Sequence, residues 1–251
     1  MPFSKAAGHR LEYRRLDGTR PPIVMLHEGL GSVSMWKRFP EEVARATGHE
    51  VWVYSRHGHG ESDALEGPRQ PRYMHDEALG ALPDFLSSLG IVKPILLGHS
   101  DGASIALIYA GANPRLLAGL IVLAPHVFVE DLSTRSIAAT GKAYFTTDLR
   151  AKLARHHRAV DRMFRGWNDI WLHPDFRRWS IEEYLSSIRV PVLAVQGSDD
   201  EYGTMEQVRR IADAVPHTTV VELESCGHSP HRDQPEPVLA AIRKFVPACG
   251  S

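Results

Sequence analysis

The chain has 251 residues, and its 29 lysines and arginines against 30 aspartates and glutamates give no electrostatic basis for binding nucleic acid or an anionic membrane. Its two cysteines are too few for a disulfide framework. No apolar run approaches the roughly 20 residues of a membrane-spanning helix, and the N-terminus has no apolar signal region, so we expect a soluble, cytoplasmic protein.

Short apolar, β-branched segments alternate with helical patterns along most of the chain. The expected strands are residues 23–27, 51–55, 95–98, 120–124, 192–197 and 219–223, and the expected helices are residues 36–46, 75–89, 102–112, 205–214 and 237–245. Residues 11–15, before a turn at Asp17–Gly18, are expected to form part of an antiparallel hairpin. Most of the strands are apolar throughout, which is typical of parallel strands covered on both faces. The pattern predicts an α/β fold with a mostly parallel central sheet and helices on both faces.

One long segment, residues 126–187, breaks this alternation. It has no strand pattern but is rich in aromatic and charged residues, so we expect a helical insertion between two strands of a core formed by residues 1–125 and 188–251. Trp167 and Trp171 have helical spacing within it. These aromatic side chains either pack the insertion onto the core or line a substrate pocket.

A G-x-S-x-G motif lies between an expected strand and an expected helix. Its residues are Gly98, His99, Ser100, Asp101 and Gly102. In this context the serine occupies a tight, strained turn that exposes its hydroxyl at the end of the sheet. Ser100 is therefore the candidate nucleophile, and an ordinary glycine-rich turn is the alternative.

A serine nucleophile needs a base, and the base needs an acid. His228 follows the last expected strand and is the candidate base, whereas His231 is a competitor that lies beyond a proline. An acidic run follows the preceding strand, in which Asp200 is the preferred acid and Asp199 is the alternative. The run could equally be a solvated acidic loop.

An oxyanion hole needs two backbone N–H groups that point at the developing negative charge. Asp101, directly after the serine, is expected to provide one of them. The loop after the first long strand is expected to provide the other, from Gly29 or, as an alternative, from Leu30.

Glu28 precedes Gly29 in the same loop, and its carboxylate would oppose the charge of an oxyanion unless it were neutralised. Our hypothesis is that Glu28 pairs with a cation such as Arg56, or holds the loop through backbone N–H groups. The alternative is that it faces the pocket and takes part in substrate recognition or proton transfer.

The order Ser100, Asp200, His228 resembles that of the α/β-hydrolase family. Five segments resemble the motifs of that family in order and spacing: residues 27–32, 56–62, 98–102, 197–200 and 227–228. The resemblance implies that residues 126–187 form a helical cap, and it is closest to small bacterial capped hydrolases, which include esterases, lactonases and carbon–carbon bond hydrolases. Glu28 stands where the family usually has glycine. Ser229 stands where hydrolases of ring-cleavage products often have tryptophan.

The sequence thus predicts a serine hydrolase that cleaves a small carboxylic ester, thioester or lactone through an acyl-enzyme. Hydrolysis of a carbon–carbon bond by the same triad is the second hypothesis, and a ligand-binding protein without turnover is the third. Pocket candidates are Glu28, Leu30, Trp167 and Trp171.

The expected partner is a small-molecule carbonyl compound, with no nucleic acid and no membrane, and the oligomeric state stays open. A slight excess of basic residues in the cap permits a carboxylate-bearing substrate. No nucleotide-binding motif is present, and His57 and His59 lack an evident third ligand, so we expect neither a cofactor nor a metal.

Overall fold

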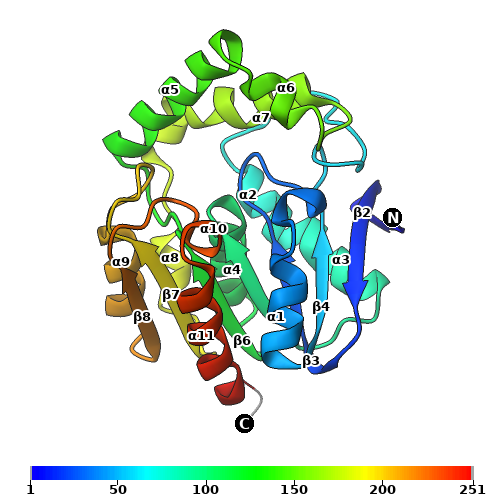
Figure 1. The fold of residues 1–251 in the computed structure, drawn as a ribbon, viewed down its shortest axis with the longest axis vertical. Coiled ribbons are helices and arrows are strands. Elements are labelled where there is room, and N and C mark those ends of the chain that lie inside the picture. The colour runs from blue at the N-terminus through cyan, green and yellow to red at the C-terminus, as the bar shows by residue number, and fades with distance from the viewer. Residues whose placement is uncertain (1, 250–251) are drawn as a thin grey trace.

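A computed structural model describes residues 2–249 and contains an eight-stranded sheet with the strand order β1-β2-β4-β3-β5-β6-β7-β8 (Figure 1). The strands are β1 (Phe3–Ala6), β2 (His9–Leu16), β3 (Thr19–Leu26), β4 (His49–Tyr54), β5 (Ile95–His99), β6 (Gly119–Leu123), β7 (Val192–Gly197) and β8 (Thr218–Leu223). Strands β3 to β8 pair in parallel, and β1 and β2 are antiparallel to their neighbours. The mostly parallel sheet is confirmed, and all six expected strands are present within a few residues.

The predicted hairpin forms around a different turn. Strand β2 pairs with β1 through the turn at Ala7 and Gly8, whose φ angles are both positive (49° and 82°), as tight hairpin turns require. The turn at Asp17–Gly18 leads instead from β2 to β3, and β4 lies between these two strands. The expectation based on Asp17–Gly18 was wrong because the strands that flank this turn are not paired.

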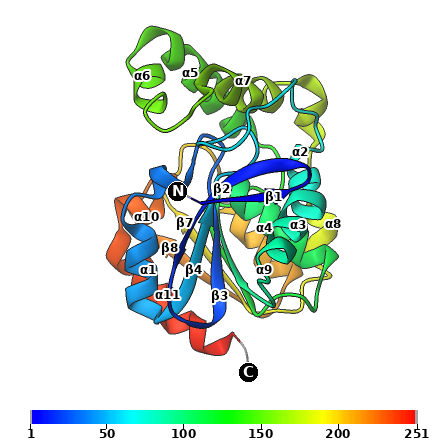
Figure 2. The same ribbon diagram turned by 90° about the vertical axis from the view of Figure 1, so that its right-hand side faces the viewer.

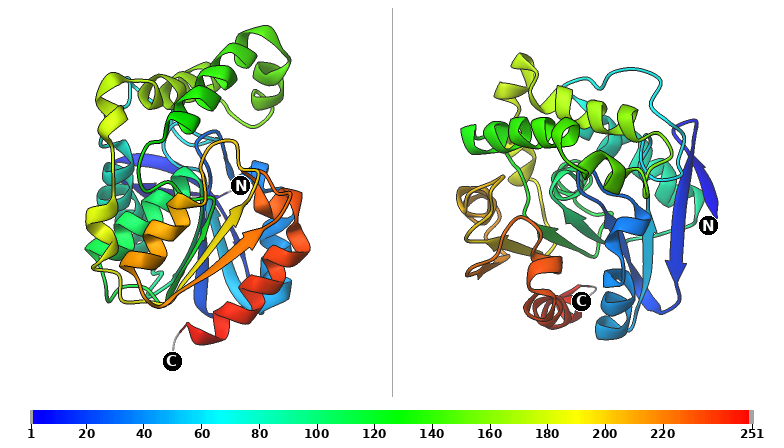
Figure 3. Two further views of the ribbon diagram at one scale, coloured as in Figure 1. Left: turned by 90° about the vertical axis from the view of Figure 1, so that its left-hand side faces the viewer. Right: turned by 45° about the horizontal axis from the view of Figure 1, so that its top comes forward.

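Helices cover both faces of the sheet (Figures 2 and 3). One face carries α1 (Phe39–Thr47), α10 (Pro230–Asp233) and α11 (Pro235–Phe245); the other carries α3 (Leu82–Ser88), α4 (Asp101–Ala112), α8 (Glu182–Leu185) and α9 (Glu206–Ala214). Each face has its own apolar core, so most parallel strands are buried on both sides. This double burial explains why their sequences are apolar throughout.

Two expected helices are divided in the structure. Residues 73–88 form α2 (Tyr73–Asp76), the π-helical turn η2 (Glu77–Ala81) and α3 in succession. The expected helix 36–46 is divided into the 3₁₀ turn η1 (Val33–Trp36) and α1, whose first turn contains Pro40. A proline is readily accommodated in the first turn of a helix, since the N–H that it lacks has no partner there.

The segment between β6 and β7 is helical. It contains α5 (Asp131–Thr146), α6 (Leu149–Leu153), α7 (Val160–Trp171), η3 (Pro174–Arg178) and α8. Helices α5, α6 and α7 lie above the carboxyl edge of the sheet (Figures 1 and 2), whereas α8 packs against α4 of the core. Within residues 2–249, no helix has the length and apolar character to cross a bilayer.

Candidate active site

Ser100 lies in the sharp turn between β5 and α4, with φ 52° and ψ −119°. A Cβ atom added to Gly98 would collide with the backbone of Gly102 and Ala103, and one added to Gly102 would collide with the carbonyl of Leu26. The two glycines thus permit the close approach of β5, α4 and β3. This packing holds Ser100 in a conformation that L-residues rarely adopt.

His228 and Asp200 meet Ser100 at the carboxyl edge of the sheet. Asp200 lies in the loop after β7 and His228 in the loop after β8. The hydroxyl Oγ of Ser100 lies 2.9 Å from Nε2 of His228, and Nδ1 of His228 lies 2.9 Å from each carboxylate oxygen of Asp200. If Nδ1–H donates to Asp200, Nε2 is free to accept the hydroxyl proton of Ser100.

The Asp200 carboxylate is fixed by further donors. The backbone N–H groups of Tyr202 and Gly203 donate to Oδ1, at 2.7 and 3.1 Å, and the Gln196 side-chain amide donates to Oδ2 at 2.7 Å. Burial alone would raise the pKa of Asp200, but the charge and hydrogen bond of His228, together with the N–H of Tyr202, lower it. Asp200 therefore remains a carboxylate when it faces the imidazole.

The same pair raises the pKa of His228 above its ordinary value of 6.5. Burial alone would lower this pKa, because it disfavours the imidazolium. The charge of Asp200 and its hydrogen bond outweigh the effect of burial. The raised pKa means that the imidazolium, the form that His228 takes after it accepts a proton, is stabilised at this position.

The two alternative residues lie elsewhere. Asp199 is exposed, and its carboxylate accepts a hydrogen bond from the hydroxyl of Ser198 at 3.0 Å. His231 is buried on α10, where its ring packs against Trp36 and Phe39. The structure thus brings Asp200 and His228 to Ser100, and it leaves Asp199 and His231 outside this hydrogen-bonded chain.

Two backbone N–H groups beside Ser100 are free. Gly29 and Asp101 line the same cavity as Ser100, and neither N–H has a hydrogen-bond partner within residues 2–249. The N–H of Leu30 differs, because it donates to Oε2 of Glu28. Of the two loop positions that the sequence leaves open, the structure therefore leaves Gly29 able to donate to a ligand.

The expected pairing of Glu28 with Arg56 was wrong. Arg56 Nη2 donates to the backbone carbonyl of Glu28 at 3.1 Å, whereas the Glu28 carboxylate holds the loop through the N–H of Leu30, as our other expectation had it. Glu28 also lines the Ser100 cavity. Burial raises the pKa of its carboxyl group, and the charge of Arg232 offsets part of this rise.

The cavity over Ser100 has a volume of about 260 Å³. All four pocket candidates, Glu28, Leu30, Trp167 and Trp171, line it. Its apolar wall includes further side chains from the inserted helices: Ile137, Leu149 and Leu153. Residues of the sheet edge and of the insertion together line this cavity.

Other cavity residues were not anticipated from the sequence. His99 Nε2 lies 2.7 Å from the backbone carbonyl of His228 and donates to it, which ties the histidine loop to the nucleophile turn. Burial lowers the pKa of His126, whose ring lies 5.6 Å from that of His228, to about 3. Tyr202 and Arg232 complete this part of the wall. Of these residues, only His99 could have been identified from the sequence, because it belongs to the G-x-S-x-G motif.

The arginines of the inserted segment do not line this cavity. Among the lining residues that the structure describes, Arg232 of α10 is the one arginine or lysine. Arg150 pairs instead with Asp161 at the surface of the insertion, at 2.6 Å. Any carboxylate on a substrate would therefore meet Arg232 rather than the insertion.

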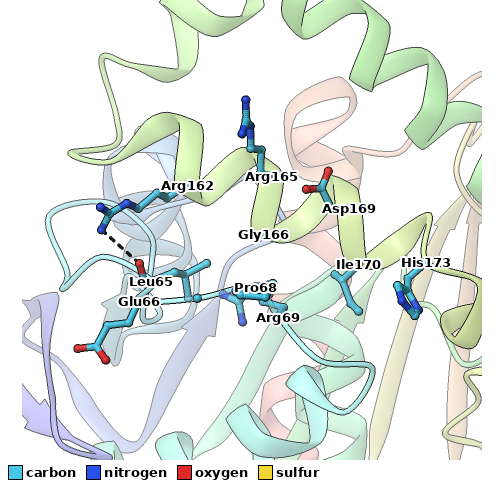
Figure 4. A pocket seen from close by; sticks show the side chains of 11 residues that line it. Leu65, Glu66, Pro68, Arg69, Arg162, Arg165, Gly166, Asp169, Ile170 and His173 are labelled. Atoms are coloured by element: carbon cyan, nitrogen blue, oxygen red, sulfur yellow. Dashed lines mark hydrogen bonds between the residues drawn. The ribbon is translucent and has the colours of Figure 1, made fainter.

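A second cavity, of about 370 Å³, lies on the other side of α7 (Figure 4). Arg162, Arg165 and Asp169 are on this side of the helix, and Arg162 Nη1 donates to the carbonyl of Leu65 at 3.5 Å. Trp167 and Trp171 are on the opposite side, as 100° per residue requires. None of the Ser100 triad lines this second cavity.

His57 and His59 do not come together as metal ligands. Nε2 of His57 contacts the carbonyl of Ala64 at 3.2 Å, and Nε2 of His59 contacts the carbonyl of Gly29 at 3.1 Å. Across residues 2–249 there is no group of three or more histidine, cysteine, aspartate or glutamate side chains that could hold a metal ion.

Comparison with known proteins agrees with this architecture. The profile of the alpha/beta hydrolase family matches residues 23–241. The putative carbamate hydrolase RutD of Pseudomonas savastanoi pv. phaseolicola is 25% identical over 94% of this chain and 98% of its own length. The 2-hydroxy-6-oxononadienedioate/2-hydroxy-6-oxononatrienedioate hydrolase 2 of Pseudomonas putida is 24% identical over 94% of this chain and 91% of its own.

Solved structures show the same fold. The enol-lactonase from Burkholderia xenovorans LB400 aligns with a TM-score of 0.74 over 98% of this chain and 100% of its own, at 20% identity. The family profile and the structural alignment both extend along nearly the whole length of the chain. The chain belongs to the alpha/beta hydrolase family, and hydrolysis is the class of activity that this membership supports.

Proposed function

We propose that this protein is a serine hydrolase that cleaves a small carboxylic ester, thioester or lactone. The observation that carries the proposal is the hydrogen-bonded chain from Ser100 through His228 to Asp200, which ends at a cavity with two free N–H groups. This chain provides a nucleophile, a base and an orienting acid in hydrogen-bond reach of one another.

The reaction proceeds through an acyl-enzyme. His228 Nε2 takes the hydroxyl proton as Ser100 Oγ attacks the carbonyl carbon, and the N–H groups of Gly29 and Asp101 hold the resulting oxyanion. His228 then gives the proton to the leaving group as the tetrahedral intermediate collapses. A water molecule, activated by His228, releases the acid and frees Ser100.

The cavity supports a small substrate with an apolar part. A volume of about 260 Å³ lies near the lower end for small-molecule sites. Residues 126–187 act as the cap that covers the core formed by residues 1–125 and 188–251, and the cap side chains Trp167 and Trp171 contact the substrate. The similarity to a putative carbamate hydrolase and to an enol-lactonase supports hydrolysis of a small carbonyl compound.

Hydrolysis of a carbon–carbon bond is the second candidate. The similarity to the 2-hydroxy-6-oxononadienedioate/2-hydroxy-6-oxononatrienedioate hydrolase 2 of Pseudomonas putida favours it. The cavity residue after His228 is Ser229, not the tryptophan that we associate with that activity, and this favours ester hydrolysis. Turnover of dienol-diketones without turnover of any ester or lactone would reverse this order.

The direct test combines substrates with an active-site label. Purified protein is screened with short-chain p-nitrophenyl esters, thioesters, lactones and dienol-diketones, and is treated in parallel with a fluorophosphonate probe. We expect hydrolysis of at least one ester, thioester or lactone and covalent labelling at Ser100. Protein that neither turns over a substrate nor labels would instead be a ligand-binding protein of this fold.

The raised pKa of His228 predicts how the rate depends on pH. His228 accepts a proton only when it is neutral, so kcat/KM is expected to fall as the pH drops through its pKa, which lies above 6.5. The measurement is a pH profile of kcat/KM from pH 5 to 9 at constant ionic strength. An acidic limb centred below pH 6 would contradict the assignment of the Asp200–His228 pair as the base.

A further inference from the structure

The side chain of Asp101 is held in a buried polar cluster. Asp101 is 1% exposed, and its Oδ2 accepts a hydrogen bond from the hydroxyl of Tyr73 at 2.6 Å. The indole N–H of Trp171 is shared between the Tyr73 hydroxyl, at 3.1 Å, and Oδ1 of Asp101, at 3.3 Å. Nη2 of Arg56 lies 3.9 Å from Oδ2. We call Arg56, Tyr73, Asp101 and Trp171 the Asp101 cluster.

This cluster offsets an electrostatic conflict beside the nucleophile. Asp101 lines the Ser100 cavity and has an N–H without a hydrogen-bond partner within residues 2–249, whereas the carboxylate of the same residue would repel an oxyanion there. Two neutral donors and a buried guanidinium turn the carboxylate away from that position and compensate its charge. A buried carboxylate is tolerated only with such partners.

Arg56 connects the cluster to the second oxyanion donor. Its Nη1 donates to the carbonyl of His27 at 2.5 Å and its Nη2 to the carbonyl of Glu28 at 3.1 Å. Nδ1 of His27 lies 2.7 Å from the same Glu28 carbonyl, so Arg56 and His27 hold it together. The Glu28 carbonyl belongs to the same planar peptide group as the N–H of Gly29, and in a trans peptide the two point in opposite directions. A hydrogen bond that fixes this carbonyl therefore also fixes the direction of the Gly29 N–H.

Helix α7 of the insertion touches both donors. Trp171 donates to Asp101, and Trp167, one turn earlier on the same face, packs so closely on Gly29 that an added Cβ would overlap its indole ring. The position of α7 is thereby linked to the position of each N–H group.

We propose that Arg56, Tyr73 and Trp171 are positioning residues that aim the N–H groups of Gly29 and Asp101 at the reacting carbonyl oxygen, and that seating of α7 completes this arrangement. The proposal rests on the proposed function, since it concerns the same reaction. Arg56 and Tyr73 do not line the Ser100 cavity and act through Asp101 and the Glu28–Gly29 peptide, so their loss weakens the transition state more than substrate binding. Trp171 also lines the cavity, so its loss changes substrate binding as well.

Tyr73→Phe is the main test. Tyr73 does not line the Ser100 cavity, and the variant removes a single hydroxyl. We expect kcat for a short-chain p-nitrophenyl ester to fall about tenfold, with KM within about twofold, because a small misplacement of an oxyanion donor slows the chemical step. Affinity for a trifluoromethyl ketone, which forms a tetrahedral adduct with serine, should fall by the same factor as kcat.

Tyr54→Phe is the matched control. Tyr54 is a buried tyrosine of the same core, and its hydroxyl has no hydrogen-bond partner within residues 2–249. Its kcat and ketone affinity should equal those of the wild type. Trp171→Phe provides a second variant, which removes the indole N–H and keeps an aromatic ring; it carries the test if Tyr73→Phe does not fold.

The outcomes separate this inference from the proposed function. Wild-type protein that fails to label with a fluorophosphonate overturns both. If the wild type labels and both Tyr73→Phe and Trp171→Phe retain its kcat and ketone affinity, the positioning role is overturned and the serine mechanism stands. A change confined to KM in Tyr73→Phe overturns it as well, because it would indicate substrate binding alone. Trp171→Phe is judged by kcat and ketone affinity, since Trp171 also lines the cavity.

Discussion

Ser100→Ala is expected to lower kcat/KM by about 10,000-fold or more while the fold persists. The variant removes the oxygen that the proposed mechanism acylates, and it leaves Asp200, His228 and both free N–H groups in place. Hydrolysis is measured with the substrate that the screen identifies, covalent labelling with the fluorophosphonate probe, and folding by circular dichroism. Labelling should be lost together with turnover.

Ser229→Ala is the control for this substitution. Ser229 also lines the cavity, but its hydroxyl is not hydrogen-bonded to His228, so kcat/KM should stay within about threefold of the wild type. Retention of more than a tenth of the wild-type rate by Ser100→Ala would show that another group is the nucleophile.

The strain at Ser100 gives the same experiment a second readout. A non-glycine residue at φ 52° and ψ −119° lowers the free energy of unfolding by on the order of 1–3 kcal/mol through backbone strain. A glycine at this position avoids the strain but lowers the free energy of unfolding by roughly 0.4–1 kcal/mol, because it gives the unfolded chain more conformational freedom. Ser100→Gly should therefore unfold at higher denaturant concentration than Ser100→Ala, although both are inactive. Equal midpoints would mean that the turn is not strained.

The sequence was sufficient for the fold because of what the parallel strands bury. Strands β3 to β7 lie between two apolar cores, and this is why each appears as a short apolar run with turns at its ends. The neighbours of β2 in the sheet could not be predicted from such a pattern. The neighbours of a strand depend on the order of the whole sheet, and Asp17–Gly18 resembles a hairpin turn although it joins strands that are not neighbours.

The same distinction applies to the candidate site, of which one part could be predicted from the sequence and another part could not. The spacing of Ser100, Asp200 and His228 after successive strand ends is a property of the chain, since parallel strands bring their carboxyl ends to one edge. The partners of Glu28 and Arg56 depend on side-chain directions within a buried loop, and no periodicity encodes them. Helical spacing placed Trp167 and Trp171 on one face, but only the packing of α7 decides that this face covers Ser100.

The role of the acid leads to the second large effect, that of Asp200→Asn. We expect kcat/KM at its pH optimum to fall by roughly 1,000-fold to 10,000-fold. The Tyr202 and Gly203 N–H groups keep the amide oxygen at the Oδ1 position, so the amide nitrogen takes the place of Oδ2 and meets the donor of Gln196. The neutral amide can no longer stabilise the imidazolium of His228.

The pH profile of Asp200→Asn provides an independent test of the role of Asp200. The charge and hydrogen bond of Asp200 are the largest of the effects that raise the pKa of His228 against burial, ahead of the charges of Glu201 and Glu28. Without the Asp200 carboxylate this pKa is lower, so the acidic limb of kcat/KM should move to lower pH. Asp199→Asn is the matched control, because it removes the neighbouring, exposed carboxylate that does not contact His228. It should leave the rate within about twofold and the limb in place. If instead Asp199→Asn moved the limb and Asp200→Asn did not, the acid would have to be reassigned, and the loop after β7 would need a conformation that exchanges these two carboxylates.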